Sequence, residues 1–185
     1  MHSLVQLIAA ALLFTASAQA AAAPVVEGNG VGKLRVGMSV KAAKTSMPLV
    51  SDRTIADDEG GSMRSMHLRI GVATAEAEVV DGKVFRVSVR SPTLRTARGF
   101  GVGTKLNELL REPGWEGGFS EGYLFVWNTK YCGLSFELNF DPHNDPASNP
   151  AWNQDGLASL PPGTRVKSIL VRGCNHKLAN QLANQ

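Results

Sequence analysis

Apolar and polar residues alternate along several short stretches of the chain, a pattern that predicts β-strands with one buried face. The apolar positions are Leu68, Ile70 and Val72, then Ala75, Ala77 and Val79, then Phe85, Val87 and Val89, and later Leu134, Phe136, Leu138 and Phe140. Residues 123–127 precede the last of these stretches across Asn128-Thr129-Lys130, so the two segments are expected to form a hairpin. In that hairpin Glu137 and Asn139 are expected to face water.

The connection between the second and third of these strands decides their register. A two-residue turn would place Glu78 opposite Phe85 and mix the two faces of the sheet. A three-residue loop over residues 80–82 keeps one face apolar and places Glu76 opposite Arg86, which pairs opposite charges. We therefore predict the three-residue loop.

Two further segments have helical spacing and resemble each other. VGMSVKAAKTSMP (residues 36–48) and VGTKLNELLREP (residues 102–113) both begin Val-Gly and reach a proline about three turns later. Ser39 and Thr104 are the expected N-caps, because Ser and Thr hydroxyls accept hydrogen bonds from the first turn of a helix.

The strands repeat as well. DGKVFRVSVRS (residues 81–91) matches PGTRVKSILVRG (residues 162–173) in its turn glycine, its valines and its arginine. We therefore interpret residues 32–92 and 99–174 as two copies of one unit, the second with an inserted loop at 141–162. Residues 175–185 then form a C-terminal tail.

The predicted fold class is α+β. A sheet with one apolar face needs a cover, and the two short amphipathic helices supply it. We expect two tandem helix-then-antiparallel-strands units that form one two-layer domain.

The N-terminus has the features of a secretory signal. Residues 4–14 are an apolar run too short to span a bilayer. Ala18-Gln19-Ala20 fits the small-x-small cleavage pattern, which predicts a signal peptide over residues 1–20, with cleavage as late as residue 23. A short buried helix is the alternative. The chain is therefore expected to be periplasmic or secreted, with no membrane span beyond residue 23.

Charge and composition narrow the class of partner only a little. The net charge of +3 comes from residues beyond position 23. It predicts weak attraction to anionic surfaces, whereas nucleic-acid binding is not indicated, because no basic run is interleaved with aromatic residues.

The two cysteines, Cys132 and Cys174, are expected to form a disulfide. Cys132 comes just before one predicted strand and Cys174 just after another. If these strands pair antiparallel, the start of one lies beside the end of the other, within bridging distance. A catalytic thiol is the alternative, but an oxidising compartment favours the bridge.

Three glycines at alternate positions, Gly99, Gly101 and Gly103, suggest a phosphate-binding loop before the second helix. The spacing misses the dinucleotide fingerprint, which needs glycine at Thr104. Gly103 also matches Gly37 in the repeat. The segment is therefore interpreted as a turn that the fold uses twice, with Lys105 leaving weak anion binding as an alternative.

The segment GKLRVGMSVKAAK resembles the helix opening of the SmpA/OmlA family, which includes small outer-membrane-assembly lipoproteins. The tandem form is similar to the architecture of β-lactamase-inhibitor protein, and VRSPTLRTARGFGVGTKLNELL resembles uncharacterised exported bacterial proteins. This chain differs from SmpA/OmlA in lacking a lipidated cysteine and in duplicating the unit. The resemblance implies a fold and a scaffold-like or inhibitory role, and it carries over no catalytic residue and no cofactor.

Candidate chemistry is sparse. His67, His143 and His176 lack metal-ligand spacing, and Cys174-x-His176 is only a weak zinc pattern. The inserted loop holds oxygen and nitrogen ligands that would suit calcium or an acid–base pair: Asp141, His143, Asn144, Asp145, Asn153 and Asp155. A rigid surface loop is the simpler interpretation.

Interface residues are better represented than catalytic ones. Arg86, Arg90, Arg95 and Arg98 form the most basic stretch, and Trp152 and Tyr123 are aromatic residues expected to be available to a partner. For Arg86 and Arg90, pairing with Glu76 and Glu78 is the preferred alternative. Trp127 is expected in the core.

These observations favour an exported, non-catalytic binding module, such as a protein inhibitor or a cell-envelope scaffold, that contacts an envelope or extracellular protein. An envelope hydrolase that uses the Asp and His residues of the inserted loop is one alternative. A cation- or anion-binding module is another.

Overall fold

Strands dominate the computed structural model, which describes residues 25–56, 61–120, 122–140 and 156–174. A small sheet contains β1 (Val26–Glu27), β2 (Gly30–Val31) and β3 (Leu34–Arg35). A large sheet contains β4 (Leu49–Ala56), β5 (Ser62–Ile70), β6 (Ala73–Val80), β7 (Lys83–Val89), β8 (Trp115–Ser120), β9 (Tyr123–Asn128), β10 (Leu134–Leu138) and β11 (Val166–Val171). The helical elements are α1 (Val40–Ser46), α2 (Leu106–Leu109), η1 (Thr129–Tyr131) and η4 (Gly156–Ser159).

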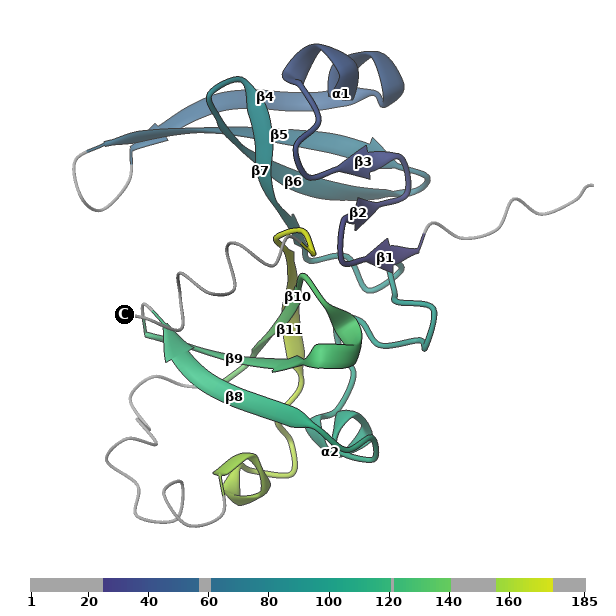
Figure 1. Ribbon diagram of the computed structural model, residues 1–185, viewed down its shortest axis with the longest axis vertical. Helices are drawn as coiled ribbons and strands as arrows, with labels where there is room; N and C mark the ends of the chain where they lie inside the picture. Colours follow the sequence, from purple (N-terminus) through teal and green to yellow (C-terminus); the bar gives the residue numbers. More distant parts are fainter. Residues whose placement is uncertain (1–24, 57–60, 121, 141–155, 175–185) are drawn as a thin grey trace, which may run out of the picture.

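The large sheet joins two meanders. Its strand order is β4-β5-β6-β7-β11-β10-β9-β8, and all neighbours are antiparallel. The last strands of the two meanders, β7 and β11, pair in the middle through Val89 with Ile169 and Val87 with Val171. The first strands, β4 and β8, form the two edges. The two meanders follow each other along the long axis of the molecule (Figure 1).

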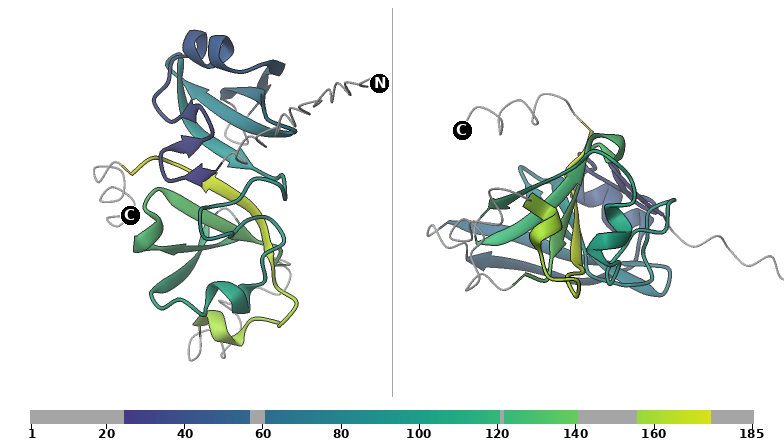
Figure 2. Two further views of the ribbon diagram at one scale, coloured as in Figure 1. Left: turned by 90° about the vertical axis from the view of Figure 1, so that its right-hand side faces the viewer. Right: turned by 90° about the horizontal axis from the view of Figure 1, so that it is seen from below.

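One face of this sheet carries the hydrophobic core. The alternating positions predicted on β5, β6, β7 and β10 are buried there, with three exceptions: Val72 lies in a turn and is 94% exposed, Phe85 is exposed, and Phe140, beyond the end of β10, is half-buried. The small sheet contributes Val26, Val31 and Leu34 to the same core. α1 lies at one end of the long axis, and α2 and η4 lie at the other (Figure 2).

The first helix forms as its sequence predicts. Ser39 is the N-cap of α1, and its hydroxyl accepts a hydrogen bond from the amide of Ala42 at 3.2 Å. Ala43 and Met47 are buried against the sheet, and Pro48 follows directly, where a helix cannot continue.

Ion pairs connect α1 to the first hairpin of the large sheet. Asp52 of β4 accepts two hydrogen bonds from the Arg64 guanidinium, both at 2.8 Å, and its carboxylate lies 2.6 Å from the Lys44 ammonium of α1. The hydrogen bonds from Arg64 and Lys44 hold the pKa of Asp52 far below its ordinary value.

The predicted α+β class of two helix-then-strands units in two layers is wrong, because strands make up most of the described structure and α1 is the one helix longer than a single turn there. α2 has four residues and stops ahead of Pro113 and Gly114, which has a φ of 88°. Thr104 is not its N-cap. Its hydroxyl instead accepts a hydrogen bond from the amide of Gly101, and Lys105 occupies the cap without a side-chain bond. The boundaries at 32–92 and 99–174 stay a prediction.

The connection between β6 and β7 is also not the predicted one. It is a two-residue turn over residues 81–82, both with positive φ, at 50° and 70°. A bulge in β7 at Phe85 takes up one residue, so that Arg86 lies opposite Glu78 and not Glu76. The bulge restores one apolar face by a route that simple alternation does not consider.

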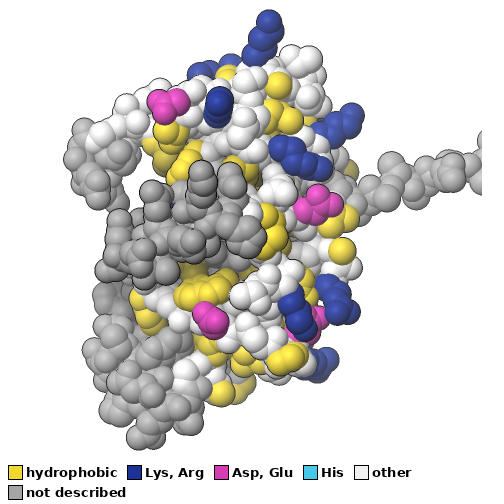
Figure 3. Space-filling model, viewed as in Figure 1, with side chains coloured by type: hydrophobic (Ala, Val, Ile, Leu, Met, Phe, Trp, Pro, Cys, Tyr) yellow, Lys and Arg dark blue, Asp and Glu magenta, His cyan; other side chains and the backbone are white. Residues whose placement is uncertain are grey.

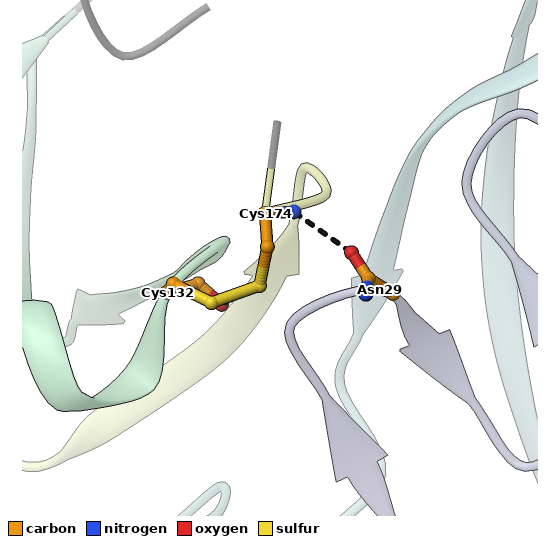
Figure 4. Close-up of a disulfide and its surroundings, with 3 residues drawn as sticks. All are labelled: Asn29, Cys132 and Cys174. Atoms are coloured by element: carbon orange, nitrogen blue, oxygen red, sulfur yellow. Dashed lines mark hydrogen bonds between the residues drawn. A yellow bond between two sulfur atoms is a disulfide. The ribbon is translucent and has the colours of Figure 1, made fainter. Parts of the chain in front are cut away.

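The predicted disulfide is confirmed. Cys132 and Cys174 are bonded, with their Cα atoms 5.1 Å apart, because β10 begins where the antiparallel β11 ends. The turn between β1 and β2 packs onto the bridge: the amide of Cys174 donates to the Asn29 side chain at 2.8 Å (Figure 4). Next to it, the amide of Gly173 donates to the carbonyl of Gly28 at 3.0 Å.

Several predictions fall on residues outside the described ranges. They are the signal peptide over 1–20, the tail 175–185, Trp152 and the candidate ligands of the inserted loop. Among the described segments, no helix has the length and apolar character that a membrane crossing requires.

Candidate functional site

The candidate site is the outer face of the large sheet, by which we mean the face opposite the hydrophobic core. Side chains alternate along a strand, so the residues between the core positions share this face. Strand register places two rows across it. One row is Ser51, His67, Glu76, Ser88, Leu170 and Ser135, and the next is Arg53, Ser65, Glu78 and Arg86.

Cross-strand ion pairs hold the middle of this face in place. The Arg86 guanidinium lies 2.7 Å from the Glu78 carboxylate, and the Arg90 guanidinium lies 3.0 Å from Glu76. This is the alternative that the sequence favoured for both arginines. With their partners fixed, these charges need little reordering when another surface approaches.

Glu76 is the most contacted carboxylate of the face. It accepts a hydrogen bond from the Ser65 hydroxyl at 2.7 Å and another from Arg90 at 3.0 Å, and the His67 Nε2 lies 3.8 Å away. Burial tends to raise the pKa of Glu76, but the Ser65 hydrogen bond and the charges of Arg90 and His67 outweigh it and place the pKa below its ordinary value. Glu76 is therefore an ionised, fully engaged group.

A small hollow opens beside Glu76. It is lined by residues from three strands: Ser51, Arg53 and Ile55 from β4, Ser65 and His67 from β5, and Glu76 from β6. Its volume is about 160 Å³. Pockets for drug-sized ligands have volumes of about 300–1,000 Å³, so this hollow suits one side chain or a small ion.

An exposed apolar strip borders the hollow. Ile55 lies opposite Met63, and both share the outer face with Val80, two residues beyond Glu78 on β6. Ile55 is 38% exposed and Val80 is 47% exposed. Nearby, the bulged Phe85 is also exposed at 47%. Apolar side chains next to ordered charges are typical of protein interfaces.

The second meander gives the outer face an aromatic part. Tyr123 is half exposed, and the Lys167 ammonium lies 5.1 Å from the centre of its ring. Trp127 was expected in the core, but it lies on the outer face and donates through its indole nitrogen to Glu116 at 3.1 Å. Glu137, expected to face water, is 7% exposed and lies 2.6 Å from the Lys167 ammonium.

The other two arginines of the basic stretch do not join Arg86 and Arg90. Arg95 donates to the carbonyl of Gly99 at 2.8 Å and to the Thr104 hydroxyl at 3.3 Å, so it closes the loop before α2. Arg98 lies 3.5 Å from the Glu112 carboxylate. The predicted basic patch is therefore divided between the sheet and this loop.

Glu112 also receives a hydrogen bond from the Tyr131 hydroxyl at 2.7 Å, next to a cluster of aromatic rings that includes Trp115. Burial and the bond to Glu112 raise the pKa of Tyr131 to about 12.

The glycine loop lies in a setting that occurs twice. The amide of Gly103 donates to the carbonyl of Val166 at 2.8 Å, and the amide of Gly37 donates to the carbonyl of Val84 at 2.7 Å. Both glycines have positive φ, 86° and 84°. A Cβ at Gly101 would lie 2.8 Å from the Arg95 side chain. These contacts are internal and structural.

Four of the six residues that line the hollow were not predicted from the sequence: Ser51, Arg53, Ile55 and Ser65. Arg53 and Ile55 lie on β4, whose sequence LVSDRTIA has no alternation because neither of its faces is fully buried. His67 was detectable, since Met66, Leu68 and Ile70 alternate and His67 falls between them. Within the described ranges, no group of three or more His, Cys, Asp or Glu residues is arranged to hold a metal.

Comparison with known proteins gives a fold and no activity. No family model matches this sequence, and no curated protein matches it. Among solved structures, the uncharacterized protein yfeY from Escherichia coli is similar, with a TM-score of 0.57 and 16% sequence identity over 80% of this chain and 98% of that one. At this identity, the similarity between the two chains is one of fold alone.

Proposed function

We propose that this chain is an exported, non-catalytic binding module that recognises an envelope or extracellular protein through the outer face of its large sheet. The disulfide between Cys132 and Cys174 supports export, because such bonds persist in oxidising compartments. The apolar run and the cleavage pattern of the N-terminal sequence also support export. An inhibitory or scaffold role fits this proposal.

One observation carries the proposal: the outer face combines an exposed apolar strip with ordered ion pairs on one rigid sheet. Ile55 and Val80 supply apolar area, while Arg86 and Arg90 are already paired with their glutamates. Apolar contacts at the centre of an interface supply affinity, and the surrounding charges supply specificity.

The charges on this face also indicate the character of the partner. The outer face of β4–β7, together with Arg90, carries four arginines and two glutamates: Arg53, Arg69, Arg86, Arg90, Glu76 and Glu78. Figure 3 shows Lys and Arg side chains at several places on the face of the molecule that it draws, alongside a few Asp and Glu side chains. A partner with an acidic surface is therefore favoured.

Capture from envelope extract tests the proposal. The chain from residue 21 onward is immobilised as wild type, as Val80→Glu and as Val72→Glu. Val72 is 94% exposed in the turn between β5 and β6, so its variant adds the same charge away from the strip. We expect a protein that the wild type and Val72→Glu both retain and that Val80→Glu binds at least about tenfold more weakly, which is the loss of about 1.4 kcal/mol expected of one interface anchor.

Two results would contradict the proposal. One is that the wild type captures nothing above the level of an unrelated exported protein. The other is that Val80→Glu and Val72→Glu retain the captured protein equally well, since the binding surface would then lie elsewhere.

A further inference from the structure

Arg53 and Glu76, which both line the hollow, differ in their contacts. Both carboxylate oxygens of Glu76 already accept hydrogen bonds, one from Ser65 and one from Arg90. Arg53 lines the same hollow from the edge strand β4 and is solvent-exposed. Among the described residues, Arg53 forms no ion pair.

The lining of the hollow has the groups that a carboxylate side chain needs. Arg53 offers a planar, bidentate donor. Across the strands, the His67 ring adds an N–H donor. Ser51 adds a hydroxyl, and Ile55 forms an apolar wall against which methylene groups can pack. With a volume of about 160 Å³, the hollow has room for the end of one such side chain.

We propose that the hollow binds the carboxylate of one Asp or Glu side chain of the partner protein, between Arg53 and His67. This rests on the proposed function, since it names a contact within the same outer face. The partner's carboxylate forms an ion pair with Arg53, which has none within the described chain, while Glu76 stays paired with Arg90. The apolar strip next to Ile55 then packs against the residues that flank that acid.

Nuclear magnetic resonance titration of the folded chain tests this directly. The probes are a capped tri-glutamate peptide, acetate and inorganic phosphate. We expect saturable shifts of the amides of residues 51–55 and 65–67 with the two carboxylate probes. Arg53→Gln should weaken peptide binding about fivefold or more, the loss of roughly 1 kcal/mol that one charge-assisted bond supplies.

Two further variants separate the contact from general attraction. Arg69→Gln removes an arginine of the same face that does not line the hollow, and it should leave binding within about twofold of wild type, as expected of a surface charge. His67→Ala removes the ring N–H and should weaken peptide binding, because it takes away the second donor that the contact uses. The dispersed spectrum of each variant shows that it is folded.

The contact is refuted if the wild type shows no saturable shifts with the peptide, if Arg53→Gln and Arg69→Gln weaken binding equally, or if phosphate binds more tightly than the carboxylates. The capture experiment with Val80→Glu stands apart from this. A partner that is lost with Val80→Glu but kept with Arg53→Gln would contradict the carboxylate contact and support the binding face. Peptide binding at the hollow without any captured partner would contradict the binding face and support the hollow as a carboxylate site.

Discussion

Removing the disulfide is the perturbation whose effect on stability can be worked out most directly from the structure. The variant Cys132→Ala with Cys174→Ala loses a bridge between residues 42 positions apart, at the junction of β10 and β11. The two strands stay paired, so the native state loses few contacts. The effect acts mainly on the unfolded chain, which gains conformational freedom when the loop is opened.

The expected magnitude depends on the length of the closed loop. For a loop of this size, the loop-closure entropy amounts to about 4 kcal/mol near room temperature. Domains of this kind have an unfolding free energy of about 5–15 kcal/mol, so the variant should still fold, but with a much smaller unfolding free energy than the wild type.

Urea denaturation followed by tryptophan fluorescence measures the effect, since the chain has three tryptophans. We expect the midpoint to fall by the equivalent of about 3–4 kcal/mol. The wild type treated with reductant should show the same loss. Asn29→Ala, which removes the side-chain acceptor for the amide of Cys174, is the control and should cost about 1 kcal/mol.

Combining Asn29→Ala with the double alanine variant tests whether the bridge also holds the β1–β2 turn. Neighbouring groups that support each other give coupling energies of about 0.5 kcal/mol or more. A loss below about 1 kcal/mol on removing the bridge would refute the loop-closure reasoning, because it would mean that the unfolded chain is not constrained by the bond.

Packing and charge give three more predictions. Gly28→Ala should lower the unfolding free energy by about 1–3 kcal/mol, because the added Cβ would lie 1.8 Å from the carbonyl oxygen of Cys132. Gly163→Ala is the matched control. No atom lies within 4 Å of its added Cβ, so the same denaturation experiment should show almost no change in stability. Asp52→Asn should cost up to about 1 kcal/mol near neutral pH. The pKa of Asp52 is lower in the folded state than in the unfolded chain, so its ion pairs stabilise the fold above the unfolded-state pKa and lose this effect as the pH falls toward the folded-state pKa. The stabilities of wild type and variant should therefore converge in acid. A difference in stability that persists in strong acid would contradict this prediction. Tyr131 should ionise at about pH 12 in an ultraviolet absorbance titration, and Glu112→Gln should lower that pKa; an unchanged titration would mean that the bond to Glu112 has no part in the shift.

Local sequence signals predicted those parts of the fold that depend on near neighbours. Ser39 caps α1 as expected, and the bridge between Cys132 and Cys174 was predicted from the ends of two antiparallel strands. The pairing of Arg86 with a glutamate was also anticipated, although with Glu78 in place of Glu76. This shift of two residues came from the two-residue turn and from the β7 bulge, and the bulge depends on packing across the sheet.

The rest of the fold depends on tertiary context that a single sequence carries weakly. β8 has the sequence WEGGFS, and its two glycines have low strand propensity, yet it pairs along its whole length with β9. The strands of the small sheet have two residues each, too few for a periodic pattern. β4 has no buried side, and the hollow depends on it, so the candidate site was the part least accessible to sequence reasoning.

The position of β11 makes the assembly of this sheet depend on the order of synthesis. It is the last strand of the described chain, yet it is the one inserted between β7 and β10. Until residues 166–171 leave the ribosome, Val87 and Val89 have no neighbour on that side of β7, and the two meanders have nothing to join them. Ile169 and Val89 are 80 positions apart, so this closing step is non-local and slow. In a nascent chain, the two meanders therefore stay unjoined until β11 has been synthesised and has paired with both β7 and β10.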